Sequence, residues 1–255
     1  FAATFGKSGT NWMMQIAQQI AHRGEAEFGH IHDVVAWPDA PFRAPTPLED
    51  LRAQDLSPTG LRVIKTHLAT QYVPYRDDAT YLTVLRDPKE VVVSSYHFLV
   101  GVAGAKRYVT PSEWFELVAR PDMLLGEWTE HTASFWEWRD RANVLVVMYP
   151  EAKNNPRDCV ERVAKTMGVA LEPAEFEKVV ERSSFRWMKA HESQFAPPRM
   201  PFVKEGAPMI RRGEAGASDE MLSRAQQIGI DEMSRAELDR LGSSFPYETA
   251  FVQAK

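Results

Sequence analysis

Short apolar runs and longer runs with helical spacing alternate along the chain. An apolar run of about four to eight residues between turn residues is typical of a buried strand. On this basis we predict strands at 1–5, 62–68, 81–85 and 144–149. The last of these, VLVVMY, is apolar throughout, as expected of a strand buried in a parallel sheet.

Helices are predicted between and after these strands. Apolar residues that include Trp12 recur at near-helical spacing and predict a helix over 11–23. Pro88 is well placed as the first residue of a helix that runs through Tyr96. Further helices are predicted at 156–167, 173–182 and 218–241. Strands that alternate with helices favour an α/β fold, with a central parallel sheet flanked by helices.

We expect the whole chain, 1–255, to be a single domain, because it shows no internal repeat and no linker. Two segments have few periodic signals. The first, 33–58, is rich in proline. The second, 192–217, holds many proline, glycine and arginine residues, and a long loop of this kind is typically functional. We predict that the second segment is a lid that closes over a bound nucleotide.

Composition narrows the class of protein. Hydrophobic residues make up 44% and charged residues 25% of the sequence, as in ordinary soluble globular proteins. The net charge of −5 argues against a general nucleic-acid role. The single cysteine, Cys159, rules out a disulfide within the chain and argues against a cysteine-based zinc site. Without a membrane-spanning apolar run or a signal peptide, the protein is expected to be cytoplasmic, with no membrane partner.

The loop at 6–10, after the first predicted strand, reads Gly-Lys-Ser-Gly-Thr. Small residues such as Gly9 let backbone N–H groups approach an anion, and a helix that starts near Asn11 directs its positive end at the same point. Lys7 adds a cation, and Ser8 and Thr10 add hydroxyl donors. Strand, small-residue loop and helix together predict a P-loop-like phosphate-binding turn.

Two known phosphate loops can be compared with this segment. The nucleoside-triphosphatase loop, Gly-x-x-x-x-Gly-Lys-Ser/Thr, matches at 6–8 but requires a glycine where this chain has Phe1. The segment instead resembles the phosphosulfate-binding loop of cytosolic sulfotransferases, in which Lys-Ser-Gly-Thr is followed by one residue and a tryptophan. Those positions are held here by Lys7, Ser8, Gly9, Thr10 and Trp12.

A second motif, Lys65-Thr66-His67, ends the second predicted strand. The ends of parallel strands face the ligand crevice, and alternation places Lys65 and His67 on one face. A histidine there suits a general base, although a lone histidine at a strand end is more often structural. The triplet resembles the Lys-Thr-His of cytosolic sulfotransferases, whose histidine is the catalytic base. Their glycan-modifying relatives usually lack it.

A third motif places Arg86 at a strand end and Ser94 in the following predicted helix. An arginine fork and a hydroxyl in this arrangement could converge on one phosphate, although arginines that only cap a strand are common. The segment resembles the 3′-phosphate-binding region of cytosolic sulfotransferases: an arginine, seven residues, a serine and a nearby Tyr-His-Phe. The resemblance implies that Arg86 and Ser94 bind that phosphate.

Arg211, Arg212 and Gly213 begin a basic segment near the end of the long loop. Alone, such a segment is typical of a solvated turn. It resembles the family's Arg-Lys-Gly-x-x-Gly, which implies a further contact with the 3′-phosphate. The chain then departs from the family, because Ala-Ser-Asp at 217–219 replaces the usual Asp-Trp-Lys and the usual dimer motif is absent. We expect a monomer or a homodimer without that motif.

Weaker correspondences concern the adenine and the acceptor. Trp12 and Phe185 match the aromatics on the two faces of the adenine, Ser183 lies in a Ser-Ser-Phe that resembles the family's Thr-Ser-Phe, and Tyr149 matches a tyrosine near the base. Each of these residues could equally belong to the core. Segments that by resemblance flank the acceptor hold four aromatics: Trp37, Phe42, Tyr72 and Phe98.

The resemblance implies a sulfotransferase that uses 3′-phosphoadenosine-5′-phosphosulfate (PAPS) as co-substrate and releases 3′-phosphoadenosine-5′-phosphate (PAP). His67 would take the acceptor proton, Lys65 would hold the sulfuryl oxygens and Lys7 would stabilise the departing phosphate oxygen. Ser94 would bind the 3′-phosphate and hold Lys7 back until the acceptor arrives. The lysines supply the positive charge, so no metal is expected.

The expected acceptor is a small, fairly apolar alcohol or phenol, because aromatic lining around one polar catalytic group is usual in small-ligand sites. Two alternatives remain open from the residues alone. One is a P-loop kinase or ATPase. The other is a catalytically silent nucleotide-binding protein that keeps the fold.

Overall fold

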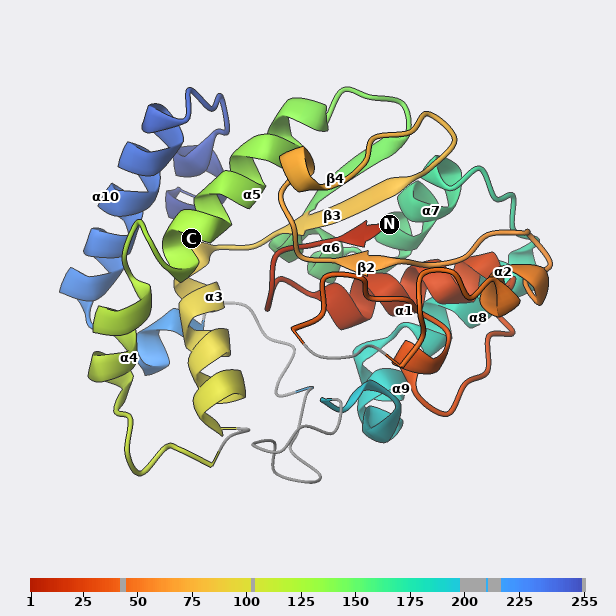
Figure 1. Cartoon of the computed structure of the whole chain (residues 1–255), viewed down its shortest axis with the longest axis horizontal. Helices are drawn as coiled ribbons and strands as arrows, with labels where there is room; N and C mark the ends of the chain where they lie inside the picture. The colour runs from red at the N-terminus through yellow and green to blue at the C-terminus, as the bar shows by residue number, and fades with distance from the viewer. Residues whose placement is uncertain (42–44, 102–103, 198–209, 211–216, 254–255) are drawn as a thin grey trace.

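In the described part of the chain, four short parallel strands form the sheet at the centre of the molecule (Figure 1). The structure is a computed structural model, and it describes residues 1–41, 45–101, 104–197, 210 and 217–253. The strands, in the spatial order β2-β1-β3-β4, are β1 (Ala2–Ala3), β2 (Lys65–Thr66), β3 (Tyr81–Leu85) and β4 (Val144–Met148). The predicted fold class, an α/β fold with a central parallel sheet flanked by helices, is confirmed.

The pairing of β1 with β2 determines where the residues directly after these two strands lie. Ala3 pairs with Thr66, so Thr4 and His67 leave the sheet side by side. β2 is shorter than the predicted strand 62–68, because only its two residues pair with β1 and a single bridge joins Ala36 to Ile64.

The other strands agree with the prediction to different degrees. β3 has the predicted bounds, whereas β1 covers only part of 1–5. β4 ends at Met148, because Tyr149 is already the first residue of a helix, α6 (Tyr149–Asn154).

Helices cover both faces of the sheet. The core on one face is shared by α1 (Thr10–Ala21), α7 (Pro156–Thr166) and α8 (Pro173–Arg182) and includes Leu82 and Val84 of β3. On the other face Tyr81 packs with Phe135 of α5 (Leu124–Trp138). Successive residues of a strand point to opposite faces, and all of β3 is buried. The predicted helices at 11–23, 156–167 and 173–182 agree with α1, α7 and α8 to within two residues.

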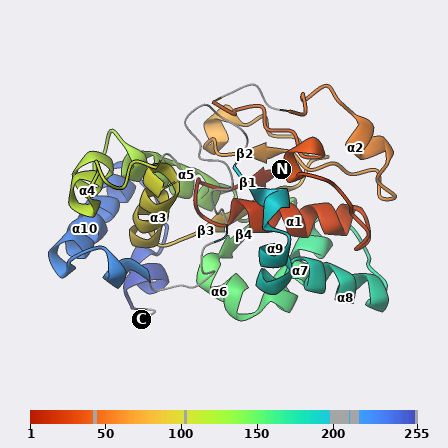
Figure 2. The ribbon, with the colours of Figure 1, turned by 90° about the horizontal axis from the view of Figure 1, so that it is seen from below.

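A second group of helices lies beside the sheet and packs against α5: α3 (Pro88–Ser95), α4 (Pro111–Val118) and α10 (Arg224–Arg240) (Figures 1 and 2). Pro88 is the first residue of α3, as predicted, and the Asp87 carboxylate caps the helix by accepting a hydrogen bond from Lys89 N–H. The predicted helix 218–241 begins later than expected. Ala217–Glu220 forms a 3₁₀ turn, and Ser223 then caps α10.

The other helical elements are short. α2 (Arg52–Asp55) lies within 33–58, and α9 (Phe185–Ala190) follows α8. A π-helical turn, Tyr96–Val100, extends α3, and another lies at Glu248–Val252. Further 3₁₀ turns lie at Ile31–Asp33, Thr70–Tyr72 and Glu192–Phe195. Most of the predicted lid falls outside the described residues. Within the described part of the chain, every helix is too short or too polar to cross a membrane.

Candidate active site

The loop between β1 and α1 has the backbone conformation of an anion-binding turn. Lys7 and Gly9 both lie in the left-handed region, with φ of 66° and 102°. A side chain is rarely tolerated there, so the conformation of Lys7 marks a locally strained backbone of the kind found at functional sites. Gly9 also approaches Tyr149 closely, because a Cβ at this position would lie 3.3 Å from the Tyr149 Cε2 atom.

The start of α1 offers donors to a ligand. No side chain of the described residues caps this helix, whose N-cap is Gly9. The hydroxyls of Thr4 and Thr10 are 2.5 Å apart, which ties the loop back to β1. Ser8 is fully buried, and its hydroxyl has no hydrogen-bond partner among the described residues. Uncapped N–H groups and an unused buried hydroxyl fit a phosphate at this position.

His67 is bound to this same loop. Its Nδ1 atom lies 2.7 Å from the carbonyl oxygen of Thr4, and a carbonyl only accepts, so Nδ1 carries the proton and Nε2 has the lone pair. Burial, the charge of Lys65 and the charge of Lys7 lower the pKa of His67 to about 3. The imidazole is therefore neutral near pH 7, as a general base must be.

Lys65 lies on the same side as His67. Its Nζ atom is 3.2 Å from the ring centroid of Trp37, and the Trp37 and His67 rings meet edge to face with centroids 5.4 Å apart. The pKa of Lys65 is lowered to about 7, chiefly by burial; the charge of Asp39 opposes this shift and the charge of Lys7 adds to it. Lys65 and His67 thus both contact the Trp37 ring, although β2 itself ends at Thr66.

Lys7 completes a cluster of cations. Its Nζ atom lies 3.8 Å from the ring centroid of Phe98. Burial, and then the charge of Arg86, lower the pKa of Lys7 to about 7. Two lysines whose ammonium forms are disfavoured by burial and by neighbouring cations fit a site that receives an anion.

Arg86 is held on three sides. Its Nε donates to Glu90 at 2.9 Å, its Nη1 donates to the Lys7 carbonyl at 2.8 Å, and its guanidinium lies over Tyr149 at 4.5 Å from the ring centroid. Nη2 forms no hydrogen bond with a described residue and could bind a phosphate oxygen.

The two serines near the end of α3 have different surroundings. Ser95 is buried, donates to the Val92 carbonyl at 2.7 Å and accepts from Trp114 Nε1 at 3.1 Å. Its hydroxyl is used inside the fold. Ser94 is half-buried, and of the two it is the one that could reach a ligand.

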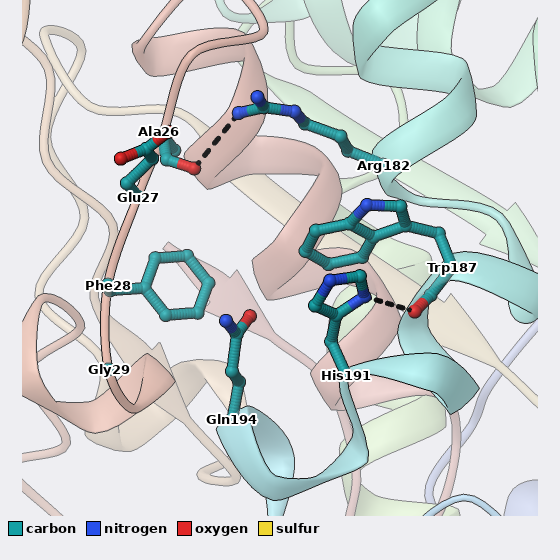
Figure 3. A pocket seen from close by; sticks show the side chains of 8 residues that line it. All are labelled: Ala26, Glu27, Phe28, Gly29, Arg182, Trp187, His191 and Gln194. Atoms are coloured by element: carbon teal, nitrogen blue, oxygen red, sulfur yellow. Dashed lines mark hydrogen bonds between the residues drawn. The ribbon is translucent and has the colours of Figure 1, made fainter.

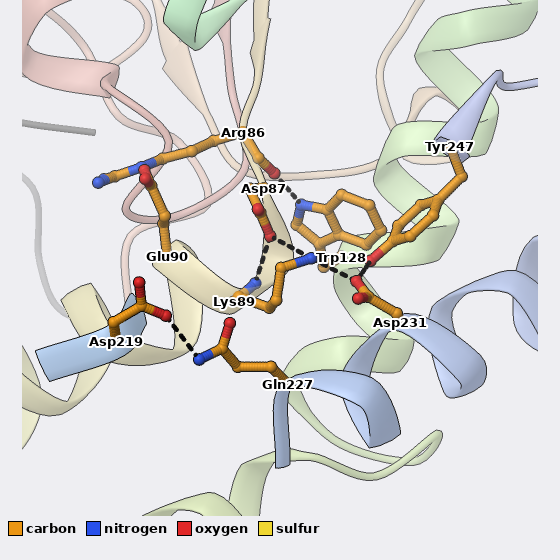
Figure 4. A network of polar contacts seen from close by, with 9 residues as sticks. All are labelled: Arg86, Asp87, Lys89, Glu90, Trp128, Asp219, Gln227, Asp231 and Tyr247. Carbon is orange, nitrogen blue, oxygen red and sulfur yellow. Dashed lines mark hydrogen bonds and ion pairs between the residues drawn. The ribbon is translucent and has the colours of Figure 1, made fainter. Parts of the chain in front are cut away.

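A buried polar network supports the strand end that carries Arg86 (Figure 4). The Lys89 side chain is 2% exposed and pairs with Asp87 at 3.2 Å and with Asp231 of α10. Asp231 also accepts a hydrogen bond from the Tyr247 hydroxyl at 2.7 Å. The network joins the start of α3 to α10 and to the segment that follows it.

The residues predicted for the adenine site lie at the ends of α1 and α8. Trp12 Nε1 donates to the Ser183 carbonyl at 2.9 Å, and the Trp12 ring lies edge to face with Tyr149, with centroids 6.3 Å apart. The Ser183 hydroxyl is turned inward and donates to the Val179 carbonyl at 2.7 Å. Phe185, at the start of α9, is 46% exposed.

Other predicted residues stand apart from this cluster. Asn11 donates to the Phe195 carbonyl at 3.2 Å, and Tyr72 is 62% exposed on a 3₁₀ turn with no described contact to Lys65 or His67. Four predicted residues lie outside the described part of the chain: Phe42, Arg211, Arg212 and Gly213. The described residues hold no group of three or more His, Cys, Asp or Glu side chains placed for a metal ion.

The site also contains three residues that were not predicted. Thr4 binds His67, Glu90 binds Arg86, and the Asp39 carboxylate accepts a hydrogen bond from His67 N–H at 2.9 Å. Glu90 lies between Arg86 and Ser94 of the third motif, and Thr4 lies in the predicted strand directly before the phosphate loop, whereas Asp39 lies in an irregular stretch that carries no local signal.

Comparison with known proteins adds to this geometry. The model of the sulfotransferase domain family matches residues 1–242. The chain belongs to the sulfotransferase family. The predicted family, and with it a PAPS-dependent sulfotransferase, is thereby confirmed.

Two proteins with similar sequences are named sulfotransferases. Sulfotransferase 2A1 of Macaca fascicularis is 29% identical over 250 residues, which cover 96% of this chain and 86% of that protein. Sulfotransferase 1C2 of Oryctolagus cuniculus is 28% identical over 257 residues, which cover 96% and 84% of the two chains.

Similar structures show the fold of the family. Retinol dehydratase in complex with androsterone and the inactive cofactor PAP has a TM-score of 0.72 at 18% identity, with 96% of this chain and 81% of that chain covered. Mouse sulfotransferase SULT7A1 complexed with PAP has a TM-score of 0.65 at 20% identity, with 94% and 87% covered.

A separate cavity of about 610 Å³ lies between the segment that follows α1 and the segment from α8 to Gln194 (Figure 3). Trp187 and His191 stack in it with ring centroids 3.9 Å apart, and Arg182 binds the Ala26 carbonyl at its edge. None of the residues that line it belongs to the predicted sulfotransferase site.

Proposed function

We propose that this sulfotransferase moves the sulfuryl group of PAPS to the hydroxyl of a small-molecule acceptor, with His67 as general base. One observation carries the proposal. A neutral histidine is bonded through Nδ1 to the phosphate loop, and the charges of Lys65 and Lys7 both act on its imidazole. A base beside cations at a phosphate-binding turn suits group transfer to an oxygen.

The donor site is assigned to residues on both sides of the loop. Lys7, Ser8, Gly9 and Thr10, together with the start of α1, would hold the 5′-phosphosulfate. Arg86 and Ser94 would bind the 3′-phosphate. Trp12, Tyr149 and Phe185 would surround the adenine. Arg211, Arg212 and Gly213 keep their role as predicted from the sequence alone.

When bound, PAPS supplies an activated sulfuryl group. His67 Nε2 would accept the proton of the acceptor hydroxyl, and the bond from Nδ1 to Thr4 would keep the ring in the correct tautomer. Lys65 and Lys7 would hold negative charge on either side of the transferred group. With reactants held in line, catalysis comes mainly from positioning and charge stabilisation. Because the lysines provide the charge, the proposal requires no metal.

The acceptor is proposed to be an apolar alcohol or phenol. Trp37 and Phe98 lie against the two lysines and would form an aromatic wall next to the base. Solved relatives are named in complex with androsterone and with retinol, two alcohols of this character.

Ligand titration followed by an assay tests the function. PAP should stabilise the protein against heat, whereas ATP and GTP should not. Labelled PAPS should then transfer to members of a panel of phenols, sterols, fatty alcohols and sugars. Stabilisation by ATP alone would favour the kinase or ATPase. Stabilisation by PAP without transfer to any acceptor would favour a catalytically silent protein, and transfer to sugars alone would overturn the proposed acceptor.

A further inference from the structure

Asp39 reaches His67 from a segment distant in the sequence. The backbone runs beside β2 up to Ala36, where Lys65 N–H donates to the Ala36 carbonyl at 2.8 Å. A turn follows, closed by a hydrogen bond from Ala40 N–H to the Trp37 carbonyl at 3.2 Å. This turn places the Asp39 carboxylate at the end of β2, where its Oδ2 atom accepts from His67 N–H at 2.9 Å.

His67 is therefore fixed at two points. Asp39 holds its main-chain nitrogen, and Thr4 holds its ring nitrogen. Fixing the backbone together with the imidazole leaves little freedom for the position of Nε2. A shift of about 1 Å in a reacting group can lower a rate by about a hundredfold, so such anchoring has a direct effect on turnover.

The second carboxylate oxygen has a different environment. Asp39 Oδ1 is buried and has no hydrogen-bond partner among the described residues. The residue as a whole is half-buried, and the charge of Asp39 acts on Lys65 in the sense that keeps the lysine protonated. Among the described residues, the other titratable groups that interact with Lys65 are Lys7, His67 and His32. Lys7 disfavours its charge, and the two histidines are neutral near pH 7, so Asp39 is the acidic member of the group.

We propose that Asp39 is a positioning residue for sulfuryl transfer: it anchors His67 through Oδ2 and serves as the counter-charge of Lys65. The inference rests on the proposed function, because it assigns Asp39 to the base and the lysine of that reaction. It adds a carboxylate that acts through both residues and need not touch the substrate.

Two substitutions separate the two roles. Asp39→Asn keeps an oxygen that accepts from His67 N–H but removes the charge, and Asp39→Ala removes both. Asp55→Asn, at an exposed aspartate of α2, is the matched control. For each variant we would measure kcat/KM for PAPS from pH 5.5 to 9, PAP affinity, thermal stability and amide exchange at His67.

The variants should differ in their response to pH. At pH 7.5 Asp39→Asn should lose several-fold in kcat/KM, because Lys65 deprotonates more readily. It should recover toward wild type near pH 6, where Lys65 regains its proton. Asp39→Ala should lose about ten- to a hundredfold at both pH values, and the His67 amide should exchange faster. Asp55→Asn should match wild type.

Three results would overturn the inference. They are wild-type kcat/KM in both Asp39 variants, an equal loss in both without a shift of the pH profile, and unchanged exchange of the His67 amide in Asp39→Ala. A failure of the proposed function has a different signature, since the wild-type protein itself would then transfer no sulfuryl group.

Discussion

The carbonyl oxygen of Thr4 accepts a hydrogen bond from Nδ1 of His67 at 2.7 Å. This bond joins two segments that are 63 residues apart in the chain, the end of β1 and the end of β2. It follows from the register of the sheet, because Ala3 pairs with Thr66 and the next residue of each strand must then emerge together. The sheet thus sets the tautomer of the proposed base.

Substitution of His67 tests the base. His67→Ala should lower turnover by about a hundredfold or more and leave PAP affinity within about twofold, because the base acts on the acceptor proton. His67→Asn is the matched variant, since its amide nitrogen can still donate to Thr4 but no base remains at Nε2. Turnover with labelled PAPS and PAP titration would be measured on both. Near wild-type turnover in His67→Asn would show that the bond to Thr4, and not proton transfer, is what the histidine provides.

Arg86 should distinguish nucleotides by their 3′-phosphate. Arg86→Ala should weaken PAP binding by about ten- to a hundredfold, because a hydrogen bond to a charged group is worth about 1.5–3 kcal/mol. The loss for adenosine-5′-phosphosulfate, which lacks that phosphate, should be much smaller. Calorimetric titration of both ligands measures the difference. Arg157→Ala removes an exposed arginine of α7 and controls for net charge. Equal losses of affinity for the two ligands would show that Arg86 supports the loop conformation through its bond to the Lys7 carbonyl and does not bind the 3′-phosphate.

The affinity for PAP should fall as the pH rises above 7. The pKa of Lys7 and that of Lys65 are both lowered to about 7 in the free protein, chiefly by burial. A bound anionic ligand raises both pKa values again, because its negative charge stabilises the protonated lysines. Binding above pH 7 therefore requires the lysines to take up protons. The affinity should therefore drop by up to about tenfold per pH unit for each lysine.

Titration calorimetry between pH 7.5 and 9, in buffers of different ionisation enthalpy, would count the protons taken up. This range lies above the second pKa of a phosphate ester, about 6. Lys7→Arg keeps its charge throughout and should remove part of the pH dependence. An affinity independent of pH over this range would contradict the lowered pKa values.

The sequence predicts the parts of this fold that depend on local pattern. The apolar run of β3 and the prolines that open α3, α7 and α8 locate those elements to within a residue. β2 was placed too long, because pairing with β1 is a tertiary property that apolar residues at 62–64 do not reveal. α5 was not predicted. Trp128 and Phe135 are seven residues apart on its buried face, but the other buried positions between them include the polar residues Thr129, His131 and Thr132.

The residues of the candidate site also divide into those that a local sequence pattern reveals and those that depend on tertiary structure. Lys7, Lys65, His67 and Arg86 stand in motifs with fixed spacing and meet in the structure. Asp39 could not be recognised, because its role comes from the bridge between Ala36 and Ile64, which carries an irregular segment past the end of β2. A residue that acts through a distant main-chain N–H leaves no pattern along the chain.

The buried ion pairs of Lys89, near the start of α3, should contribute strongly to the free energy of unfolding. Lys89→Met leaves Asp87 and Asp231 buried without their cation, and loss of one partner of a buried pair costs about 3–5 kcal/mol. Tyr247→Phe removes one bond to Asp231 and should cost about 1.5–3 kcal/mol. Arg157→Met breaks an exposed pair and should have far less effect. Urea denaturation would measure the free energy of unfolding of the three variants. Equal losses for Lys89→Met and Arg157→Met would show that the buried network contributes no more to stability than an exposed ion pair.

Gly9 should be needed for both the loop and the nucleotide. Its φ of 102° is unfavourable for any other residue by about 1–2 kcal/mol, and a Cβ would lie 3.3 Å from the ring of Tyr149. Either Tyr149 or the loop must then move, and Arg86 lies over the same ring. Gly168→Ala is the matched control, because Gly168 has a φ of 69° with open space around its Cβ position. Both variants should lose stability in thermal unfolding, but only Gly9→Ala should weaken PAP. Equal PAP affinity in the two variants would show that the approach of the loop to Tyr149 has no part in nucleotide binding.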